Sequence, residues 1–399
     1  MIRPNKAWYL LLLSLICCKK PYNPPAITAP GSYLVVEGVI NSGSDSTIIK
    51  LSKTVNLSSP VITNAVLHAV VAVESDQNIS FPLTETTNGN YVSAGLNLDN
   101  THNYRLSIKT SNSEQYSSDF VAVLNAPPID SVSYGIEGNE LNIYSNTHDP
   151  TNTVKYYRWD YQETWIFHST YDSQSVSNGD TVLQRTANQQ VYQCWASDTS
   201  SNIIIGSSAK LSKDVIVNNP ITSIASSSEK LTTKYSILVR QYALTGDAYN
   251  FWTNLKTNTE QLGGIFDAQP SQLNGNIHCI TNPSEPVIGY ISVGNISSQR
   301  IFITNQQLPG WVTTPAYPLS VCPLDTEYIV IYLAPHMRLP VYEEDQYYNY
   351  DKSIFSGLLL IPVEPVGLPG QPVTGHSGSF PLCVDCTLRG TTKQPGFWK

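Results

Sequence analysis

Two pairs of cysteines give the sequence its most distinctive chemistry, and the first pair ends an apolar run. Residues 9–25 read YLLLLSLICCKKPYNPP, so Cys17 and Cys18 separate apolar residues from lysines and prolines. The run follows a positively charged start and is shorter than the about 20 apolar residues of a membrane-spanning helix. A simple secretory signal would end in an A-x-A-like site, which this run lacks. The pattern resembles a bacterial lipobox, in which the cysteine after the run is acylated.

Cys18 is the better candidate for the lipidated residue. A cut before Cys18 leaves the small Cys17 on one side and Leu15 three places upstream, whereas a cut before Cys17 leaves bulky Ile16 there. Several acyl chains, such as palmitate, each contribute about 0.8 kcal/mol per buried methylene and anchor a protein stably. We therefore expect a signal peptide over residues 1–17 and a membrane anchor at Cys18. A plain signal peptide or membrane anchor that contains cysteines is the alternative.

The residues after the anchor predict a spacer. Residues 18–32 are rich in proline, which favours extended polyproline geometry, and contain little that could form a core. We expect them to be a tether that holds the folded part away from the membrane.

The second pair, Cys383 and Cys386, forms a C-x-x-C near the C-terminus. Such a pair is half of a zinc site, but the sequence has no second one. Thioredoxin-like redox chemistry would need an α/β context that the flanking residues lack. We expect a structural disulfide in which Cys322 bonds one of the pair and ties the tail to the body, with metal binding, redox chemistry and free thiols as alternatives. Once the signal peptide with Cys17 is removed, five cysteines remain besides the lipidated one, so at least one thiol is left over within the mature chain.

The sequence predicts no catalytic residue, no metal site and no cofactor. Residues 375–379 read GHSGS, which nearly matches a G-x-S-x-G nucleophile elbow, but position 379 is serine. The stretch also reads as a Pro/Gly loop instead of the strand-to-helix turn that an elbow needs. The seven histidines are scattered, and none forms H-E-x-x-H or another close ligand pair.

Acidic and tyrosine side chains gather near residue 345. Carboxylate oxygens suit Ca²⁺, and tyrosines provide large amphipathic contacts at a low entropic cost. A solvated polar loop would have the same composition. The candidate binding surface comprises Tyr342, Tyr347, Tyr348 and Tyr350, beside the carboxylates Glu343, Glu344, Asp345 and Asp351.

Composition disfavours nucleic acid as a partner and favours an exported β protein. The formal net charge is -8 over 399 residues, and a nucleic-acid-binding protein needs a basic face. Only 14% of the residues are charged, while there are 24 tyrosines and 26 prolines. Polar, uncharged, tyrosine-rich sequence with many turn residues is typical of exported β-sheet proteins.

Residues 33–125 predict a β-sandwich. Short strand-like segments recur about every 8–12 residues and are separated by turn residues. Asn88-Gly89 is a favoured hairpin turn because both residues accept positive φ. Leu98 followed by Tyr104 resembles the tyrosine corner of immunoglobulin-like domains, in which the tyrosine hydroxyl bonds nearby backbone.

Residues 126–310 predict a second sandwich, so the fold class is mainly β with tandem immunoglobulin- or fibronectin-like sandwich domains. Residues 247–262 carry apolar side chains at helical spacing, which predicts an inserted α-helix covering an open face or end of the sandwich. VIGYISVG (residues 287–294) and QRIFIT (residues 299–304) are expected to close this second sheet. Residues 311–399 are expected to form an irregular extension whose C-x-x-C tail packs on the second domain.

Several stretches together resemble a known family. They are PYNPP after the lipidated cysteine, YLVVEGVIN, residues 235–303, and the ending CVDCTLRGTTKQPGFWK. The combination is similar to the Bacteroidota lipoproteins called domain of unknown function 4249, over nearly the whole mature chain. The resemblance carries no activity and no catalytic residue with it. It implies a companion of TonB-dependent outer-membrane receptors, whose genes tend to lie beside those of the family.

These features predict a non-catalytic, lipid-anchored protein of the cell envelope at the outer membrane. The resemblance implies that it assists a TonB-dependent receptor in nutrient uptake, by binding a ligand or the receptor itself. Lys19-Lys20 follow the lipidated cysteine where export signals of this phylum are usually acidic, so the surface and the periplasmic face are both open. The alternatives are an envelope glycan hydrolase, whose paired carboxylates would lie about 5–9.5 Å apart, and a structural or adhesive surface protein.

Overall fold

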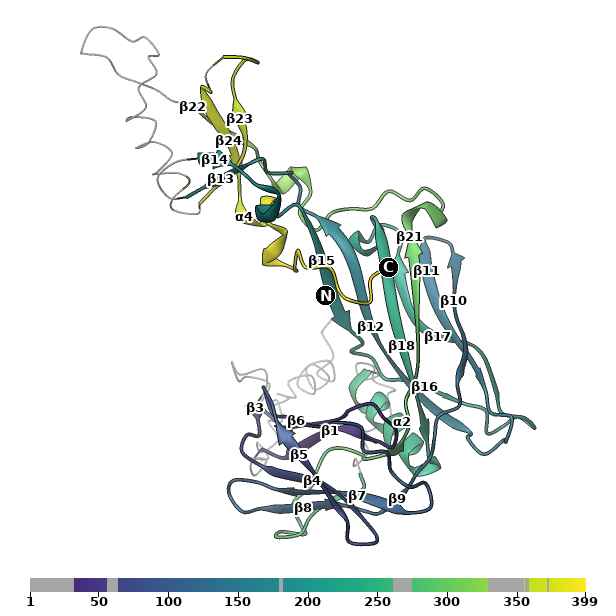
Figure 1. Cartoon of the computed structure of the whole chain (residues 1–399). Coiled ribbons are helices and arrows are strands. Elements are labelled where there is room, and N and C mark those ends of the chain that lie inside the picture. The colour runs from purple at the N-terminus through teal and green to yellow at the C-terminus, as the bar shows by residue number, and fades with distance from the viewer. Residues whose placement is uncertain are drawn as a thin grey trace, which may run out of the picture.

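The protein consists mainly of β-strands arranged in three units, from the N-terminal unit at the bottom of Figure 1 to the C-terminal one at the top. The computed structural model describes residues 32–55, 64–178, 182–260, 275–328, 355, 359–371 and 373–399. The first two units are β-sandwiches, which confirms the predicted mainly β fold with tandem sandwich domains. The predicted signal peptide and nearly all of the tether lie outside the described residues. Among the described residues, no helix has the length and apolar character needed to cross a membrane.

The first unit is built from eleven strands of the described chain. These strands are β1 (Leu34–Asn41), β2 (Thr47–Lys53), β3 (Asn64–Ala65), β4 (Val70–Ser75), β5 (Ser80–Glu85), β6 (Asn90–Ser93), β7 (Asn103–Lys109), β8 (Gln115–Ser118), β9 (Val121–Ala122), β19 (Ile277–Cys279) and β20 (Val293–Gly294). They pair in the order β19-β8-β7-β4-β5-β6-β2-β1-β20, with β3 beside β2 and β9 beside β7. β5 pairs with both β4 and β6, so one strand joins the two layers that enclose the core.

Several local features that the sequence predicts for the first sandwich are present in the structure. In β7, buried and more exposed residues alternate, as expected for a strand that covers a core with one face. The Tyr104 hydroxyl donates a hydrogen bond to the Asp99 carbonyl oxygen at 3.1 Å, which is the predicted tyrosine corner. Asn88 and Gly89 both have positive φ, at 58° and 75°. These features depend on neighbouring residues, which explains why the sequence reveals them.

The predicted boundary between the two sandwiches needs a correction. The sequence places residues 275–294 in the second sandwich, but β19 pairs with β8, and β20 runs parallel to β1 in the first. Ile277, Ile291 and Val293 are buried in the first core. The chain therefore returns to the first unit after most of the second has been built. The returning strands are only two and three residues long, so their pairing depends on distant partners and leaves little local signal.

The second unit is a sandwich of two sheets. Its strands are β10 (Ile129–Glu137), β11 (Glu140–His148), β12 (Tyr156–His168), β15 (Gln193–Thr199), β16 (Ile204–Ser207), β17 (Val215–Ala225), β18 (Lys234–Leu244) and β21 (Ser297–Thr304). One sheet has the order β10-β11-β17, and the other has the order β15-β12-β18-β21 with β16 also on β12. Apolar side chains such as Trp159, Ile237 and Leu141 fill the space between the sheets. Each fully buried side chain of this kind contributes about 1.5–3 kcal/mol.

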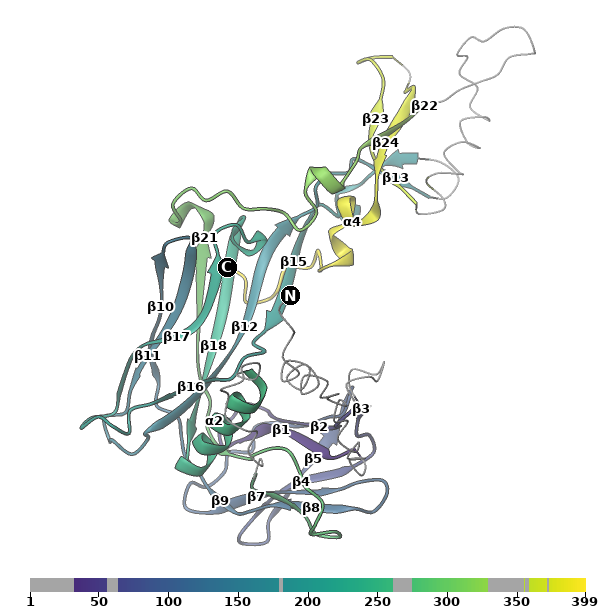
Figure 2. The same cartoon turned by 180° about the vertical axis from the view of Figure 1, so that it is seen from behind.

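The inserted helix, α2 (Gly246–Glu260), lies at the end of the second sandwich that faces the first (Figure 2). It was predicted over residues 247–262, and its last two predicted residues are outside the described part. The Thr245 hydroxyl accepts a hydrogen bond from the Ala248 N–H at 3.2 Å and caps the first turn. Ala248 and Phe251 are buried. The helix therefore covers an end of the sandwich, as its apolar spacing predicts.

The third unit is more ordered than the irregular tail that the sequence predicts. Its strands are β13 (Ser175–Ser177), β14 (Val182–Gln184), β22 (Asp325–Tyr328), β23 (Ile361–Val366) and β24 (Gly375–Ser379). β24 is the middle strand of a sheet with β22 and β23, and the β13–β14 hairpin packs beside β23. The helix α4 (Pro381–Val384) follows β24. Within the described residues, a single turn of 3₁₀ geometry occurs in five places: η1 (Ala187–Gln189), η2 (Glu229–Leu231), η3 (Asn305–Gln307), η4 (Leu319–Val321) and η5 (Cys386–Leu388).

The C-terminal residues return to the second sandwich. Trp195 in β15 and Thr391 exchange two backbone hydrogen bonds of 2.8 and 3.0 Å. The Trp398 ring packs edge-on against Trp195 and Phe302, with ring centroids 6.3 and 5.6 Å away. The tail therefore lies across the outer face of the β15-β12-β18-β21 sheet.

Candidate ligand-binding cleft between the two sandwiches

A cleft of about 1050 Å³ lies where the two sandwiches meet. β1 and β2 line it from the first unit, while β12, β18, α2 and the loop after β15 line it from the second. Figures 1 and 2 show α2 beside this junction. Sites between domains are common places for small-molecule binding. The cleft is therefore the candidate functional site of the described chain.

Backbone forms part of the cleft lining. Gly38 and Gly289 both line it and have φ of 144° and 148°. A Cβ on Gly38 would lie 2.5 Å from the Ile48 carbonyl oxygen, and one on Gly289 would lie 2.3 Å from the Val36 carbonyl oxygen. Only glycine fits such close backbone approaches without a shift. At these two positions the cleft is therefore lined by backbone.

Arg158 of β12 has an unusual setting in the cleft wall. Its guanidinium carbon lies 4.4 Å from the ring centroid of Tyr242, its neighbour on β18, and 4.4 Å from that of Trp252 on α2. Within the described chain, Arg158 has no hydrogen-bond acceptor and no carboxylate partner at ion-pair distance. The side chain is half-buried. Two aromatic rings therefore hold a positive charge in place and leave its N–H groups free.

Arg240 lies on the same face of the sheet and is paired. Its Nε donates to the Asp160 carboxylate at 2.5 Å, and the Tyr242 hydroxyl donates to the other oxygen of that carboxylate at 2.7 Å. Burial alone would lower the pKa of Arg240, but the Asp160 carboxylate outweighs burial and raises it above its ordinary value. Burial, together with the same carboxylate, raises the pKa of the Tyr242 hydroxyl. Both oxygens of Asp160 are thus engaged by Arg240 and Tyr242, and no ion pair joins Asp160 to Arg158 within the described chain.

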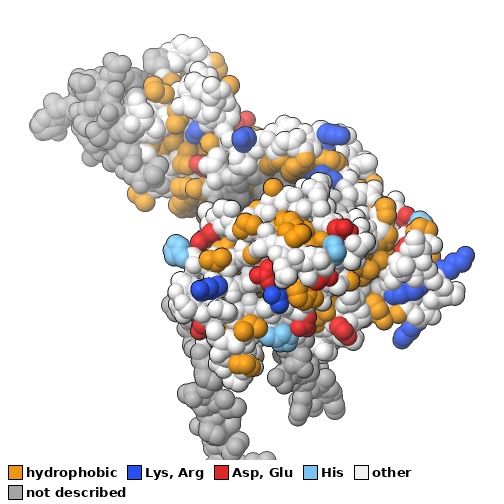
Figure 3. Space-filling view, turned by 60° about the horizontal axis from the view of Figure 1, so that its bottom comes forward, with side chains coloured by type: hydrophobic (Ala, Val, Ile, Leu, Met, Phe, Trp, Pro, Cys, Tyr) orange, Lys and Arg blue, Asp and Glu red, His pale blue; other side chains and the backbone are white. Residues whose placement is uncertain are grey.

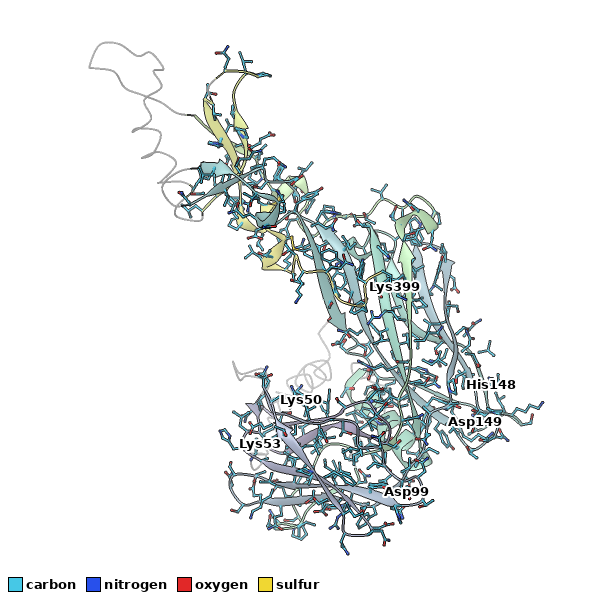
Figure 4. The ribbon with its side chains drawn as sticks, in the orientation of Figure 1. Lys50, Lys53, Asp99, His148, Asp149 and Lys399 are labelled. Atoms are coloured by element: carbon cyan, nitrogen blue, oxygen red, sulfur yellow. A yellow bond between two sulfur atoms is a disulfide. The ribbon has the colours of Figure 1, made fainter. Side chains whose placement is uncertain are left out.

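The facing wall comes from the first sandwich. Lys50 of β2 pairs with Glu37 of β1 at 3.3 Å, and the Ile48 side chain on the same strand is 53% exposed. Figure 4 labels Lys50 on the side of the first sandwich that faces the second. Asp45, in the turn between β1 and β2, adds an exposed carboxylate. This wall therefore contains the Lys50–Glu37 ion pair, the carboxylate of Asp45 and the apolar side chain of Ile48.

The two walls are held together by packed aromatic rings and by paired backbone. Tyr290, from the segment that returns to the first sandwich, packs against Phe251 of α2 with ring centroids 5.6 Å apart. Its hydroxyl bonds the Thr245 side chain, and burial raises its pKa. Where the chain crosses between the sandwiches, Asn125 accepts hydrogen bonds from Ser42 and from the Asn295 N–H, both at 2.9 Å. The geometry of the cleft is therefore set by specific contacts.

Most residues that the sequence singled out lie away from this cleft or outside the described chain. The predicted lipidation site, Cys18, and the acidic and tyrosine-rich segment of residues 342–351 belong to the parts that the structure does not describe. The candidate binding surface of Tyr342, Tyr347, Tyr348 and Tyr350 therefore stays a prediction. Within the described residues, no group of three or more His, Cys, Asp and Glu side chains is arranged to hold a metal ion.

The cysteines of the C-x-x-C bond two different partners. Cys383 is joined to Cys322, and Cys386 is joined to Cys194 of β15, with Cα atoms 5.7 Å apart in both disulfides. The expected bond from Cys322 to one member of the pair is present, and Cys194 is a partner that the sequence did not indicate. Cys279 is buried with a free thiol.

The GHSGS stretch is a buried strand and not the predicted loop. It forms β24, between β22 and β23, and all five of its residues are buried. The Ser377 hydroxyl exchanges hydrogen bonds of 3.3 Å with the backbone of Glu364. The small residues allow close packing, since a Cβ on Gly378 would lie 2.7 Å from the Phe355 ring. Ser377 therefore contributes to the structure of the sheet.

The sequence analysis missed Arg158, Tyr242 and Trp252. The sequence of β18 contains a weak indication of this site. Charged and aromatic residues occupy alternate positions on the face opposite the core, where Arg240 and Tyr242 lie. The sequence of α2 alone, or of the strands alone, does not predict that Trp252 lies over the same face of the sheet. The site depends on the packing of a helix against a sheet.

Comparison with known proteins gives a family but no activity. A family model described as "Domain of unknown function (DUF4249)" matches residues 19–300. No curated protein matches the chain. A two-domain fibronectin type III segment of chicken tenascin is 12% identical, covers 54% of this chain and 93% of its own, and has a TM-score of 0.16. A Bacteroides uniformis protein described as carbohydrate-binding is also 12% identical, with coverages of 54% and 91% and a TM-score of 0.15. Similarities at such TM-scores say nothing of what this chain binds.

Proposed function

The chain belongs to the family described as domain of unknown function DUF4249, and we propose that it is a non-catalytic binding protein that takes its ligand in the cleft between the two sandwiches. The observation that carries this proposal is Arg158. Two aromatic rings hold this guanidinium in place, and its N–H donors, which no described residue occupies, can bind a ligand that enters the cleft. The cleft is also large enough for a small organic ligand, since such sites usually measure about 300–1,000 Å³.

The carboxylates of the cleft support binding in preference to hydrolysis. Asp160 accepts hydrogen bonds from Arg240 and Tyr242, and Glu37 pairs with Lys50. Glycoside hydrolysis needs two available carboxyl groups about 5–9.5 Å apart. Asp45 remains as the carboxylate of this lining without a partner among the described residues. No observation favours the glycan hydrolase or the purely adhesive protein over a ligand-binding protein.

A bulky substitution in the cleft tests whether the ligand binds there. Ser201 is exposed and lines the cleft, so Ser201→Trp should obstruct the cleft without disturbing a core. Purified wild type and variant are incubated with extracts of the growth medium, washed and denatured, and the released small molecules are compared by mass spectrometry. We expect compounds retained by the wild type and lost from Ser201→Trp. Ser111→Trp, on an exposed turn of the first sandwich outside the cleft lining, is the control and should retain them. Equal retention by wild type and Ser201→Trp would contradict binding in the cleft.

We further propose that the protein is anchored in the cell envelope through lipid on Cys18 and assists a TonB-dependent outer-membrane receptor. The support is the apolar run before Cys18 and the lipoprotein family that the sequence resembles. In cells, radiolabelled palmitate should enter the wild type, and Cys18→Ser should move the protein from the membrane to the soluble fraction. Cys17→Ser is the matched control and should remain membrane-bound. A tagged copy purified from detergent-solubilised membranes should bring the receptor with it, and recovery of no receptor would remove the accessory role.

A further inference from the structure

We infer that the ligand is a carboxylate-bearing molecule whose carboxylate is bound by Arg158. This inference rests on the proposed function and names the chemical group that the cleft recognises. The two rings at 4.4 Å engage the guanidinium carbon, which leaves the N–H groups around the rim of the guanidinium plane as free donors. Those donors form a planar fork that matches the two oxygens of a carboxylate.

The contrast with Arg240 shows what Arg158 lacks. Both arginines line the same cleft, from neighbouring strands. Arg240 has the Asp160 carboxylate at 2.5 Å, and the other oxygen of that carboxylate accepts from Tyr242. Cation–π contacts contribute about 0.5–2 kcal/mol and provide no acceptor for N–H groups. Arg158 is therefore oriented by the protein but has no acceptor from the described residues.

The other charged side chains in the cleft indicate what charge the rest of the ligand carries. Lys50 is neutralised by Glu37, and Arg240 by Asp160. This leaves Arg158 and the exposed Asp45 as the charged lining residues without a partner among the described residues. A ligand with one carboxylate and an otherwise uncharged body meets this arrangement without placing like charges together.

The rest of the lining indicates the character of that body. Trp252 and Tyr290 offer aromatic rings, and Ser200 and Ser201 offer hydroxyl groups. Such a mixture suits a body with an apolar face and with hydroxyl or amide groups. A volume of about 1050 Å³ exceeds what a single small monomer fills, so a short oligomer is expected. The carboxylate can come from an acidic sugar or from the C-terminus of a short peptide.

Matched probes separate the carboxylate from the rest of the ligand. Isothermal titration calorimetry is run with N-acetylated tripeptides that have a free or an amidated C-terminus, and with disaccharides that end in glucuronate or in glucose. We expect at least one probe with a carboxylate to bind at least about tenfold more tightly than its neutral partner. The pair that shows this preference identifies the source of the carboxylate. If no carboxylate probe binds more tightly than its neutral partner, the inference is overturned.

Substitutions then assign the preference to one side chain. Arg158→Gln should abolish the difference between the charged and neutral probes, while Arg158→Lys, which keeps the charge but not the fork, should retain part of it. Lys109→Met removes one positive charge from the exposed end of β7, outside the cleft lining, and should change affinity by less than about threefold. Far-ultraviolet circular dichroism confirms that each variant is folded. A preference that persists in Arg158→Gln, or that Arg158→Lys preserves in full, would overturn the assignment to the guanidinium.

The blocked variant separates this inference from the proposed function. If neutral probes bind as well as charged ones and Ser201→Trp abolishes both, the cleft binds ligand but does not select a carboxylate. If Ser201→Trp leaves the binding of every probe unchanged, binding in the cleft itself is refuted.

Discussion

Cys194 in β15 is bonded to Cys386, which lies 192 residues further along the chain. Three residues before Cys386, Cys383 is bonded to Cys322. All four of these cysteines are buried. The C-x-x-C pair therefore fastens the C-terminal segment at two points, one on the second sandwich and one within the third unit.

We predict that the double substitution Cys194→Ser/Cys386→Ser lowers the free energy of unfolding by about 2–5 kcal/mol, because the native disulfide no longer restricts the unfolded chain. The measurement is urea unfolding followed by tryptophan fluorescence. The comparison variant is Cys322→Ser/Cys383→Ser, which leaves the tail joined to β15. Limited proteolysis under non-reducing conditions should release the C-terminal residues only from the first variant. Similar release from both would contradict the assigned roles.

Removing the hydroxyl of the tyrosine corner should destabilise the first sandwich. Tyr104→Phe leaves the Asp99 carbonyl without its 3.1 Å hydrogen bond, and we expect a loss of about 1 kcal/mol. Tyr134→Phe is the control, since that ring is 36% exposed, and its substitution should change stability by less than about 0.5 kcal/mol. Urea unfolding of both variants tests the difference. Equal stability of the two would show that the corner contributes nothing.

A buried carboxylate in the second sandwich depends on two donors. Glu163 is 3% exposed, and its oxygens accept hydrogen bonds from Lys230 and, at 2.9 Å, from the Tyr235 hydroxyl. Burial, followed by the nearby Glu163 carboxylate, raises the pKa of Tyr235 well above its ordinary value. We predict that Lys230→Met destabilises the fold by about 2 kcal/mol, because it leaves a buried charge with one donor.

The matched test for this pair is the double variant Glu163→Gln/Lys230→Met. A neutral amide needs no counter-ion, so the double variant should be more stable than Lys230→Met alone. Thermal and urea unfolding provide the comparison. If the double variant is no more stable than the single one, the charge of Glu163 is not the cause of the loss.

His376 should make the third unit sensitive to acid. Burial lowers the pKa of its imidazole from 6.5 to about 4. Between these values the unfolded chain takes up a proton that the folded chain does not, so stability is fully present above about pH 6.5 and falls as the pH is lowered towards about 4. His376→Gln should show a weaker dependence on pH over this interval. Urea unfolding of the wild type and His376→Gln at pH 7, 5.5 and 4.5 measures how the stability of each depends on pH, and an identical dependence in both would contradict this origin.

The surface of the first sandwich bears no single chemical character. On the face shown in Figure 3, acidic, basic and apolar side chains lie next to one another. The side chains of the candidate binding site, Arg158, Tyr242 and Trp252, instead line the cleft between the sandwiches. Exposed side chains are therefore poor guides to the site of this protein, and variants in the cleft are the informative ones.

The sequence by itself determined the properties that depend on near neighbours. Alternating apolar residues gave the strands, helical spacing gave α2, and Leu98 with Tyr104 gave the tyrosine corner. The match of residues 19–300 to the DUF4249 family agrees with the resemblance read from the sequence. These properties could be predicted because each arises from a few adjacent residues whose side-chain directions follow the period of the strand or helix.

Only the tertiary structure decided which distant segments meet. It brought residues 275–294 back to the first sandwich, joined Cys194 to Cys386, and placed Trp252 of α2 over Arg158 of β12. Each of these contacts joins segments that lie far apart in the chain, and each except the covalent disulfide is one of many weak contacts whose sum selects a single arrangement. Short strands and single cysteines carry little local preference, so their partners depend on how both sandwiches pack as a whole.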